Sequence, residues 1–357
     1  MTSMLSELRS SVEAVLGSDY PITLDVPAEK PGWLAIPVFA AARRLGLSPQ
    51  DHAHQVAEKL AVVPTISVTV EGGFVNIQPR AEACLRVLTE AQMPTYGHSS
   101  AGNGQTVVIE FSGVNIAKPM GIGHLRSTII GDSLQRIYRA LGYTVHAVNH
   151  LGDWGTQFGN LVAAYQRKYG DLVVRTELTV DDLLALYVDF HSKVEHDPEL
   201  KVEGQAMFRR LESGDVEVRA LWQSFVNLSL IQFEALYRRL GITFDDVRAG
   251  ESRYHPMVAA LIEQAERSQV AVESQGALVV PIPGESVPLI LRKSDGSTIY
   301  ATRDLAAITY RVREYHPDQI LYVVANEQAL HFRHVFAAAR LLKLLPDKTR
   351  LEHVKFG

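Results

Sequence analysis

The sequence predicts an α/β protein whose main part is a parallel sheet, split by a helical insertion and preceded by a small α+β domain. Three observations support this prediction. Residues 106–150 follow a strand–helix–strand pattern, and such a unit forms a right-handed crossover in a parallel sheet. A long, mainly helical pattern comes next, and strand patterns then return. The 357 residues suffice for two or three domains, since one core stops growing near roughly 250–300 residues.

Residues 1–92 contain both helix and strand patterns and are expected to form the N-terminal α+β domain. Helices are expected at residues 3–16, 34–46 and 50–61, and a strand at ITLDV, residues 22–26. The segment ISVTVEGGFVNIQP alternates apolar and polar residues around Gly72 and Gly73, which is typical of a β-hairpin. Residues 93–104 are rich in Gly, Ser and Pro and predict a linker.

The second domain is expected at residues 105–357 and begins with a strand–helix–strand unit. The β-branched run TVVIEF at 106–111 suits a buried parallel strand, and YTVHAVNH at 143–150 is the next strand. Between them, apolar residues recur at helical spacing from His124 onward, and Gly142 stands where the helix ends.

A mainly helical insertion is expected at about 158–250, with Thr179 as the cap of one helix. Strand patterns return in GALVVPIPG and in SVPLILRKSDGSTIYAT, where Asp295 and Gly296 mark a hairpin turn. QILYVVAN and the helical segment after it form another strand–helix pair. The parallel sheet is therefore expected to resume after the insertion.

Composition and charge exclude several classes of protein. The apolar fraction of 46% and the charged fraction of 21% are ordinary for globular domains, and no apolar run reaches membrane-spanning length. Charged residues interrupt the N-terminal apolar residues, unlike a secretory signal, so a cytoplasmic location is expected. A single cysteine, Cys84, excludes an intramolecular disulfide and a cysteine-based zinc site, and no metal site is expected. The net charge of −5 argues against indiscriminate nucleic-acid binding.

The segment VNIAKPMGIGH, Val114 to His124, joins the first strand of the unit to its helix and is called the signature loop below. Gly121 and Gly123 let the backbone approach a ligand, and the free amides and dipole of a helix N-terminus favour phosphate. Lys118 and His124 add further donors. A purely structural turn is the alternative interpretation of this short pattern.

A longer pattern decides between these interpretations. IEFSGVNIAKPMGIGHLRSTIIGDSLQRIYRALGY followed by NHLGDWGTQFG resembles the catalytic core of class I aminoacyl-tRNA synthetases, in its arginine-specific version. GGFVNIQ, GES at 250–252, IYATRDLAA at 299–307 and YVVANEQALHF at 322–332 match the same family in the same order. The resemblance implies a Rossmann-like, nucleotide-binding sheet and the ATP-dependent ligation of L-arginine to tRNA(Arg) through an arginyl-adenylate.

The resemblance also implies the partners and the site. Mg²⁺ accompanies ATP, adenylate formation generally needs bound tRNA, and the N-terminal domain contacts the outer corner of the tRNA. Residues assigned to ATP are Ser112, Asn115, Lys118, Gly121, Gly123 and His124, of which Lys118, Gly123 and His124 are expected to be catalytic. Residues assigned to arginine are Ser112, Asn115, Asn149, Glu251, Tyr300, Asp304 and Gln328. A monomer is expected.

The chemistry of free arginine agrees with this assignment. Its planar guanidinium has five donors, so a selective pocket should offer a carboxylate in a bidentate arrangement. Asp304 is the leading candidate, because it shares a helix face with Tyr300, and Glu251 is the second. The alternatives are that Asp304 is a surface carboxylate paired with Arg303 and that Tyr300 is a core aromatic. Asp153 and Trp154 are expected to be structural.

Two departures from the family pattern bear on activity. The family signature usually reads His-x-Gly-His, and Gly121 replaces its first histidine. The printed sequence ends where the family's KMSKS-type loop is expected to begin. Three interpretations stay open: part of an active ligase, a degenerate paralogue that binds arginine, ATP or tRNA without turnover, or a different nucleotidyl transfer.

Overall fold

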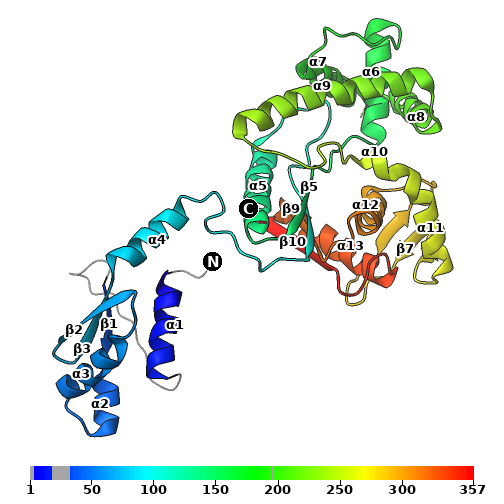
Figure 1. Cartoon of the computed structure of the whole chain (residues 1–357). Helices are drawn as coiled ribbons and strands as arrows, with labels where there is room; N and C mark the ends of the chain where they lie inside the picture. The colour runs from blue at the N-terminus through cyan, green and yellow to red at the C-terminus, as the bar shows by residue number, and fades with distance from the viewer. Residues whose placement is uncertain (1–3, 18–32, 195) are drawn as a thin grey trace. The chain divides into compact units, whose positions relative to one another are not determined.

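The computed structural model describes residues 4–17, 33–194 and 196–357, and the strand expected at residues 22–26 lies outside these ranges. The chain divides into two compact units, Met1–Ser99 and Ser100–Gly357 (Figure 1). In the part that the structure describes, no helix is long and apolar enough to cross a bilayer.

The first unit contains a three-stranded antiparallel sheet. Its order is β1–β3–β2, with β1 at Leu34–Pro37, β2 at Ile66–Glu71 and β3 at Phe74–Pro79. The helices are α1 at Met4–Leu16, α2 at Phe39–Leu45, α3 at Pro49–Leu60 and α4 at Ala81–Ala91. Helix α3 packs on β2 and β3, and Ile36, Leu60 and Ile77 are fully buried in the core between them.

The hairpin predicted around Gly72 and Gly73 is confirmed, whereas the single helix predicted at 34–46 is wrong. Gly72 has a φ of +59°, which favours glycine, and a Cβ on Gly73 would lie 2.4 Å from the ring of the exposed Phe39, which would have to move. The first part of 34–46 is strand β1, whose Leu34 pairs with Ile77 of β3. A short apolar run that is buried on both faces does not distinguish a strand from a helix, and pairing with β3 decides here.

The second unit is built on a four-stranded parallel sheet of order β10–β9–β4–β5. Its strands are β4 at Thr106–Glu110, β5 at Thr144–Val148, β9 at Gln319–Ala325 and β10 at Arg350–Phe356. The predicted strand–helix–strand unit is confirmed as β4, α5 at Ile122–Ala140, and β5, with Gly142 just past the helix end at a φ of +87°. The sequence pattern does not single out β10.

The two central strands of the sheet, β4 and β9, connect to outer strands on opposite sides. The chain passes from β4 to β5 through α5, and from β9 to β10 on the other side through α13 at Ala329–Leu341. One face of the sheet packs in a core that contains Val107 and Ile109, and the other face packs in a core with α12, at Tyr300–Tyr315, and α13. Loops therefore diverge at the carboxyl ends of β4 and β9, where sheets of this kind bind ligands.

The predicted helical insertion is confirmed. Between β5 and β9 the chain first forms α6 at Thr156–Tyr169, α7 at Val180–Val194, α8 at Pro198–Ser213 and α9 at Val216–Leu240 (green in Figure 1). The predicted cap is also present, since the Thr179 hydroxyl accepts a hydrogen bond from the backbone N–H of Asp182 at 3.2 Å. Two short helices follow, α10 at Glu251–Tyr254 and α11 at Val258–Arg267, with a turn of 3₁₀ helix between them.

The strand patterns after the insertion form a separate antiparallel sheet. Its order is β6–β7–β8, with β6 at Val272–Ser274, β7 at Ala277–Val280 and β8 at Leu289–Arg292. The turn at Asp295 and Gly296 is confirmed, but the strand expected to run through residue 302 stops at Arg292, and α12 begins at Tyr300. The side chain of Thr302 donates to the carbonyl of Leu291 at 2.6 Å, which ties the first turn of α12 to β8.

Helix α5 lies against the sheet closely enough to require a glycine. A Cβ on Gly131 would lie 2.1 Å from the ring of Phe111, which is buried and stacks on Phe244 with 4.5 Å between ring centroids. The substitution Gly131→Ala should therefore lower the free energy of unfolding by at least about 1–3 kcal/mol, because the surrounding core cannot expand without strain. Urea unfolding followed by circular dichroism measures this change.

Gly123→Ala is the matched control in the same helix. A Cβ there meets no atom within 4 Å, so the better helix propensity of alanine should leave stability equal or raise it by about 1 kcal/mol or less. Equal stability of the two variants would contradict the close approach of α5.

Candidate functional site

Three expected site residues follow three parallel strands. Ser112 lies two residues after β4, Asn149 directly follows β5, and Gln328 lies in the exposed 3₁₀ turn after β9. Because carboxyl ends of parallel strands lie at one edge of a sheet, these residues share the edge where the loops diverge.

Ser112 and Asn149 are joined through Tyr237 of α9. The hydroxyl of Tyr237 lies 2.7 Å from Ser112 Oγ and accepts a hydrogen bond from Asn149 Nδ2 at 3.1 Å. Asn149 Oδ1 accepts from the backbone N–H of Gly113 at 3.2 Å. Ser112 has a φ of +74°, a conformation that few non-glycine residues adopt. Both side chains are buried, and their hydrogen bonds hold the start of the signature loop in place.

The signature loop ends at the N-terminus of α5, as predicted. Gly121 is the N-cap, and its backbone N–H donates to Nδ1 of His124 at 3.2 Å. A ring nitrogen that accepts a hydrogen bond carries no proton, so His124 is a neutral imidazole with its proton on Nε2. Partial burial lowers the pKa of His124, which agrees with the neutral form. The exposed Gly123 leaves the first backbone amides of α5 open to a ligand.

The middle of the signature loop contacts the loop after β5 and the insertion. The Ile116 N–H donates to the carbonyl of Gly152 at 3.2 Å, and Asn115 pairs with Gly152 as an isolated bridge. Lys118 Nζ lies 4.3 Å from the ring centroid of Tyr187 in α7. A cavity of about 190 Å³ lies between the loop, α6 and α7, and its lining residues are Asn115, Ile116, Ala117, Lys118, Gln157, Phe158, Leu161 and Tyr187.

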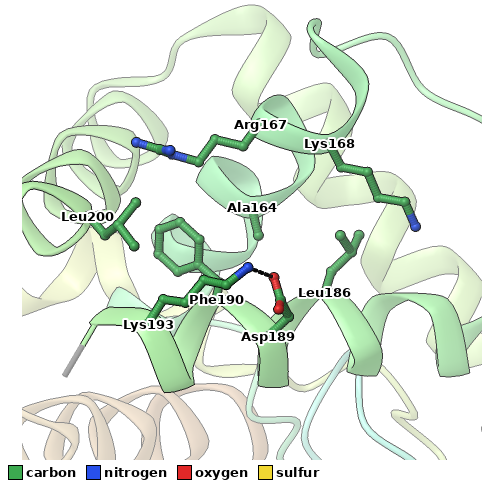
Figure 2. A pocket seen from close by; sticks show the side chains of 8 residues that line it. All are labelled: Ala164, Arg167, Lys168, Leu186, Asp189, Phe190, Lys193 and Leu200. Atoms are coloured by element: carbon green, nitrogen blue, oxygen red, sulfur yellow. Dashed lines mark hydrogen bonds and ion pairs between the residues drawn. The ribbon is translucent and has the colours of Figure 1, made fainter. Parts of the chain in front are cut away.

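A larger cavity of about 310 Å³ lies inside the insertion, among α6, α7 and α8 (Figure 2). Its charged rim is largely paired. Lys193 Nζ lies 2.7 Å from Asp189 Oδ2, and Arg167 Nε lies 2.7 Å from Glu203 Oε2. None of the expected site residues lines this cavity, so the edge of the parallel sheet remains the candidate site.

Tyr300 and Asp304 lie one turn apart on α12, and both contact His331 of α13. Asp304 Oδ2 lies 2.7 Å from His331 Nε2, and the rings of Tyr300 and His331 are 5.1 Å apart between centroids. The side chain of Asp304 is 20% exposed, whereas Tyr300 is 58% exposed. The shared helix face is confirmed, and Tyr300 is not a core aromatic.

Glu251 has a protein partner of its own. Arg303 Nε donates to Glu251 Oε2 at 2.6 Å, so the alternative pairing of Arg303 with Asp304 is not observed. Burial raises the pKa of Glu251 against the opposing effect of Arg303, and the charge of Asp304 raises it further. Two carboxyl groups therefore lie within electrostatic range of each other beside α12.

Asp153 links the loop after β5 to the GES segment, as its expected structural role requires. Its Oδ1 accepts from the Ser252 backbone N–H at 2.8 Å, and its Oδ2 accepts from the Ser252 hydroxyl at 2.6 Å. Its backbone carbonyl accepts from Trp222 Nε1 of α9 at 2.8 Å. Burial raises the pKa of the Asp153 carboxyl, although the bonds from Ser252 oppose this shift.

A buried group of charges beneath Asp304 was not predicted from the sequence. Arg311 Nη1 lies 2.5 Å from Glu110 Oε2, and Arg311 is fully buried. Arg311 Nη2 donates to His150 Nδ1 at 3.2 Å, so the proton of His150 is on Nε2, which lies 3.8 Å from Asp304 Oδ1. Burial lowers the pKa of the Arg311 guanidinium, but Glu110, Tyr254 and Tyr322 together raise it by more, so the pKa lies above its usual range.

Position alone could have indicated two of these residues. Glu110 ends a strand and His150 follows one, so each lies at the edge where a sheet of this kind binds ligands. Arg311 gives no such signal, because its partner Glu110 lies far away in the sequence, whereas His331 lies within the matched segment 322–332.

Known proteins resemble this chain in sequence and in fold. Residues 87–357 match the family model described as tRNA synthetases class I (R), catalytic domain. The chain is 43% identical over 335 residues to an arginine–tRNA ligase of Exiguobacterium sibiricum, covering 92% of this chain and 59% of the relative. It is 39% identical to an arginine–tRNA ligase of Clostridioides difficile, covering 98% of this chain and 62% of that protein. The chain thus spans about 60% of the length of these curated relatives.

Solved structures show the same fold. The arginyl-tRNA synthetase of Plasmodium falciparum superimposes with a TM-score of 0.66 at 24% identity, covering 98% of this chain and 63% of that one. The arginyl-tRNA synthetase of Thermus thermophilus superimposes with a TM-score of 0.62 at 23% identity, covering 98% of this chain and 65% of that one.

The Arg311→Met substitution should lower the free energy of unfolding by about 3–5 kcal/mol, because it leaves the Glu110 carboxylate buried without its cation. Arg313→Met, at an exposed position of the same helix, is the control and should change stability by about 0.5 kcal/mol or less. Guanidinium chloride unfolding of both variants checks this, and a similar small loss in both would contradict a buried pair.

Proposed function

The chain belongs to the class I arginyl-tRNA synthetases and contains their catalytic domain, and we propose that it activates L-arginine with ATP and transfers it to tRNA(Arg). One observation supports this most strongly. The open N-terminus of α5, which suits phosphate, and the group around Asp304, which suits a guanidinium, both lie at the carboxyl edge of one parallel sheet.

ATP is proposed to place its phosphates at the N-terminus of α5. The backbone N–H of Gly123 and the Nε2–H of neutral His124 donate to phosphate oxygens, and Lys118 supplies a positive charge. Oxygen-rich phosphates bind Mg²⁺, which is proposed to enter with ATP and to screen its charge. Ser112 and Asn115 hold the loop that forms this site.

The guanidinium of L-arginine is proposed to bind Asp304, with the ring of Tyr300 beside it and Glu251 adding negative potential. Asp304 Oδ1 has no hydrogen bond to His150, because 3.8 Å separates the two atoms. The exposed Gln328 is proposed to bind the polar groups on the α-carbon of arginine. Asn149 is assigned to the same end of the substrate and acts there through Gly113, the residue to which it is hydrogen-bonded.

The chemistry follows in two steps. A carboxylate oxygen of arginine attacks the α-phosphorus of ATP, and pyrophosphate leaves. A ribose hydroxyl of the terminal adenosine of tRNA then attacks the acyl carbon, and AMP leaves. The protein contributes positioning and preorganised donors more than covalent chemistry. The first unit of the chain, with its own core and sheet, is proposed to contact the tRNA.

The first test removes the charge of Asp304. Asp304→Asn should weaken L-arginine binding by about a hundredfold, since hydrogen bonds to charged groups contribute roughly 1.5–3 kcal/mol, and Asp304→Ala should abolish it. Isothermal titration calorimetry with this chain measures the affinity. Glu314→Gln, which removes a carboxylate from an exposed position of the same helix, is the matched control. Undiminished affinity in Asp304→Asn would remove this residue from the pocket.

The second test restores the usual signature. Gly121→His should raise the rate of arginine- and tRNA-dependent exchange of pyrophosphate into ATP by about tenfold or more, since one preorganised donor contributes about 10²–10³ in rate. The position is exposed, and the nearest atom to an added Cβ is His124 Nδ1 at 3.7 Å, which is an ordinary van der Waals contact. Gly121→Ala controls for the backbone change. If the unchanged protein and Gly121→His both bind arginine without exchange, the missing imidazole is not what prevents turnover by this chain.

A further inference from the structure

His331 contacts both residues of the proposed guanidinium site. Its Nε2 lies 2.7 Å from Asp304 Oδ2, its ring lies 5.1 Å from the ring of Tyr300, and it packs edge-on against Phe332 with 5.3 Å between centroids. The side chain of His331 is 16% exposed. The side chain of His331 therefore connects α13 to α12, at the place where substrate specificity is proposed to arise.

The Asp304 carboxylate lies between two imidazoles. His331, from α13, is hydrogen-bonded to Oδ2 at 2.7 Å, and Nε2 of His150, two residues after β5, lies 3.8 Å from Oδ1. His150 Nε2 is buried and has no hydrogen-bond partner among the residues described. One carboxylate oxygen is thus fixed by the protein, and the other is left for a ligand.

We propose that His331 is a positioning residue for arginine recognition, whose Nε2–H donates to Asp304 Oδ2 and so turns Oδ1 toward the substrate guanidinium. This inference rests on the proposed function. Each carboxylate oxygen has about two lone-pair sites, so Oδ2 can still accept from the guanidinium fork after it accepts from His331. Both oxygens of Asp304 can therefore accept from the guanidinium in a bidentate contact, and the hydrogen bond from His331 fixes the plane of the carboxylate.

The cost of losing this hydrogen bond defines the expected effect. Without the His331 donor, a mostly buried carboxylate loses a charge-assisted bond and is free to rotate about its two torsions. The carboxylate must then be ordered when the guanidinium binds, and this cost in entropy lowers the affinity for arginine. Neither effect involves the part of the site at the N-terminus of α5, so ATP binding should be unchanged.

The test compares three variants of the full chain by calorimetry with L-arginine. His331→Phe keeps the ring but removes the donor and should weaken binding about tenfold or more. His331→Gln places an amide N–H near the position of Nε2 and should restore affinity to within about threefold of the unchanged protein. His331→Asn has the same amide on a chain one carbon shorter and should resemble His331→Phe. ATP affinity should stay within about twofold in all three.

Agmatine, which is arginine without its carboxyl group, shows which end of the substrate is affected. If His331 acts through Asp304, His331→Phe should lower the affinity for agmatine and the affinity for arginine by the same factor. Weakening of arginine alone would mean that His331 binds the substrate carboxylate, and would overturn the inference. Full affinity in His331→Phe, or a His331→Gln variant as weak as His331→Phe, would also overturn it.

Failure of the proposed function gives a different result. A chain of unchanged sequence that does not bind L-arginine contradicts the proposed function, and the inference falls with it. The inference alone is contradicted if the unchanged chain binds L-arginine, Asp304→Asn loses this affinity, and His331→Phe keeps it.

Discussion

The ion pair between Glu110 and Arg311 fixes the parts of the site relative to the sheet. Glu110 ends the central strand β4, and Arg311 lies on α12, two turns after Asp304. Burial of either charge alone would be costly, so α12 cannot slide along the sheet without separating the pair. The position of Asp304 follows from this constraint. The same guanidinium orients His150, which faces Asp304 from the other side.

Each half of the site is held by elements that are distant in the sequence. The start of the signature loop depends on Tyr237 in the insertion, which joins Ser112 to Asn149. The half proposed to bind a guanidinium contacts α13 through the hydrogen bond between Asp304 and His331. A parallel sheet brings these elements together because its crossovers leave β4 and β9 in opposite directions. The insertion, which separates β5 from β9 in the sequence, therefore contributes Tyr237 to the candidate site.

Much of the architecture follows from local pattern. Periodicity and turn residues predict the hairpin, the β4–α5–β5 unit and the helical insertion, and the motifs predict that Tyr300 and Asp304 share a helix face. Local pattern fails where distant pairing decides. Strand β1 exists because β3 pairs with it, and the strand pattern after the Gly296 turn gives way to α12. Arg303 has Glu251 as its partner, 52 residues away in the sequence, so its neighbour Asp304 is free for other contacts.

The bonds from Asp153 to Ser252 close the neck of the insertion, with the two residues 99 positions apart. Closing a loop of that length costs entropy only logarithmically in its length, so the helices within it can lengthen or shorten at little cost to the sheet. Strand pairing between β4 and β9 joins segments more than two hundred residues apart, as the bond from Thr106 to Asp318 across 212 positions shows. When Asp153 and Ser252 are already joined, the length of free chain that separates β4 from β9 is much shorter before these strands pair. We therefore expect the neck to form early in folding, and its loss to slow folding more than it weakens the final structure.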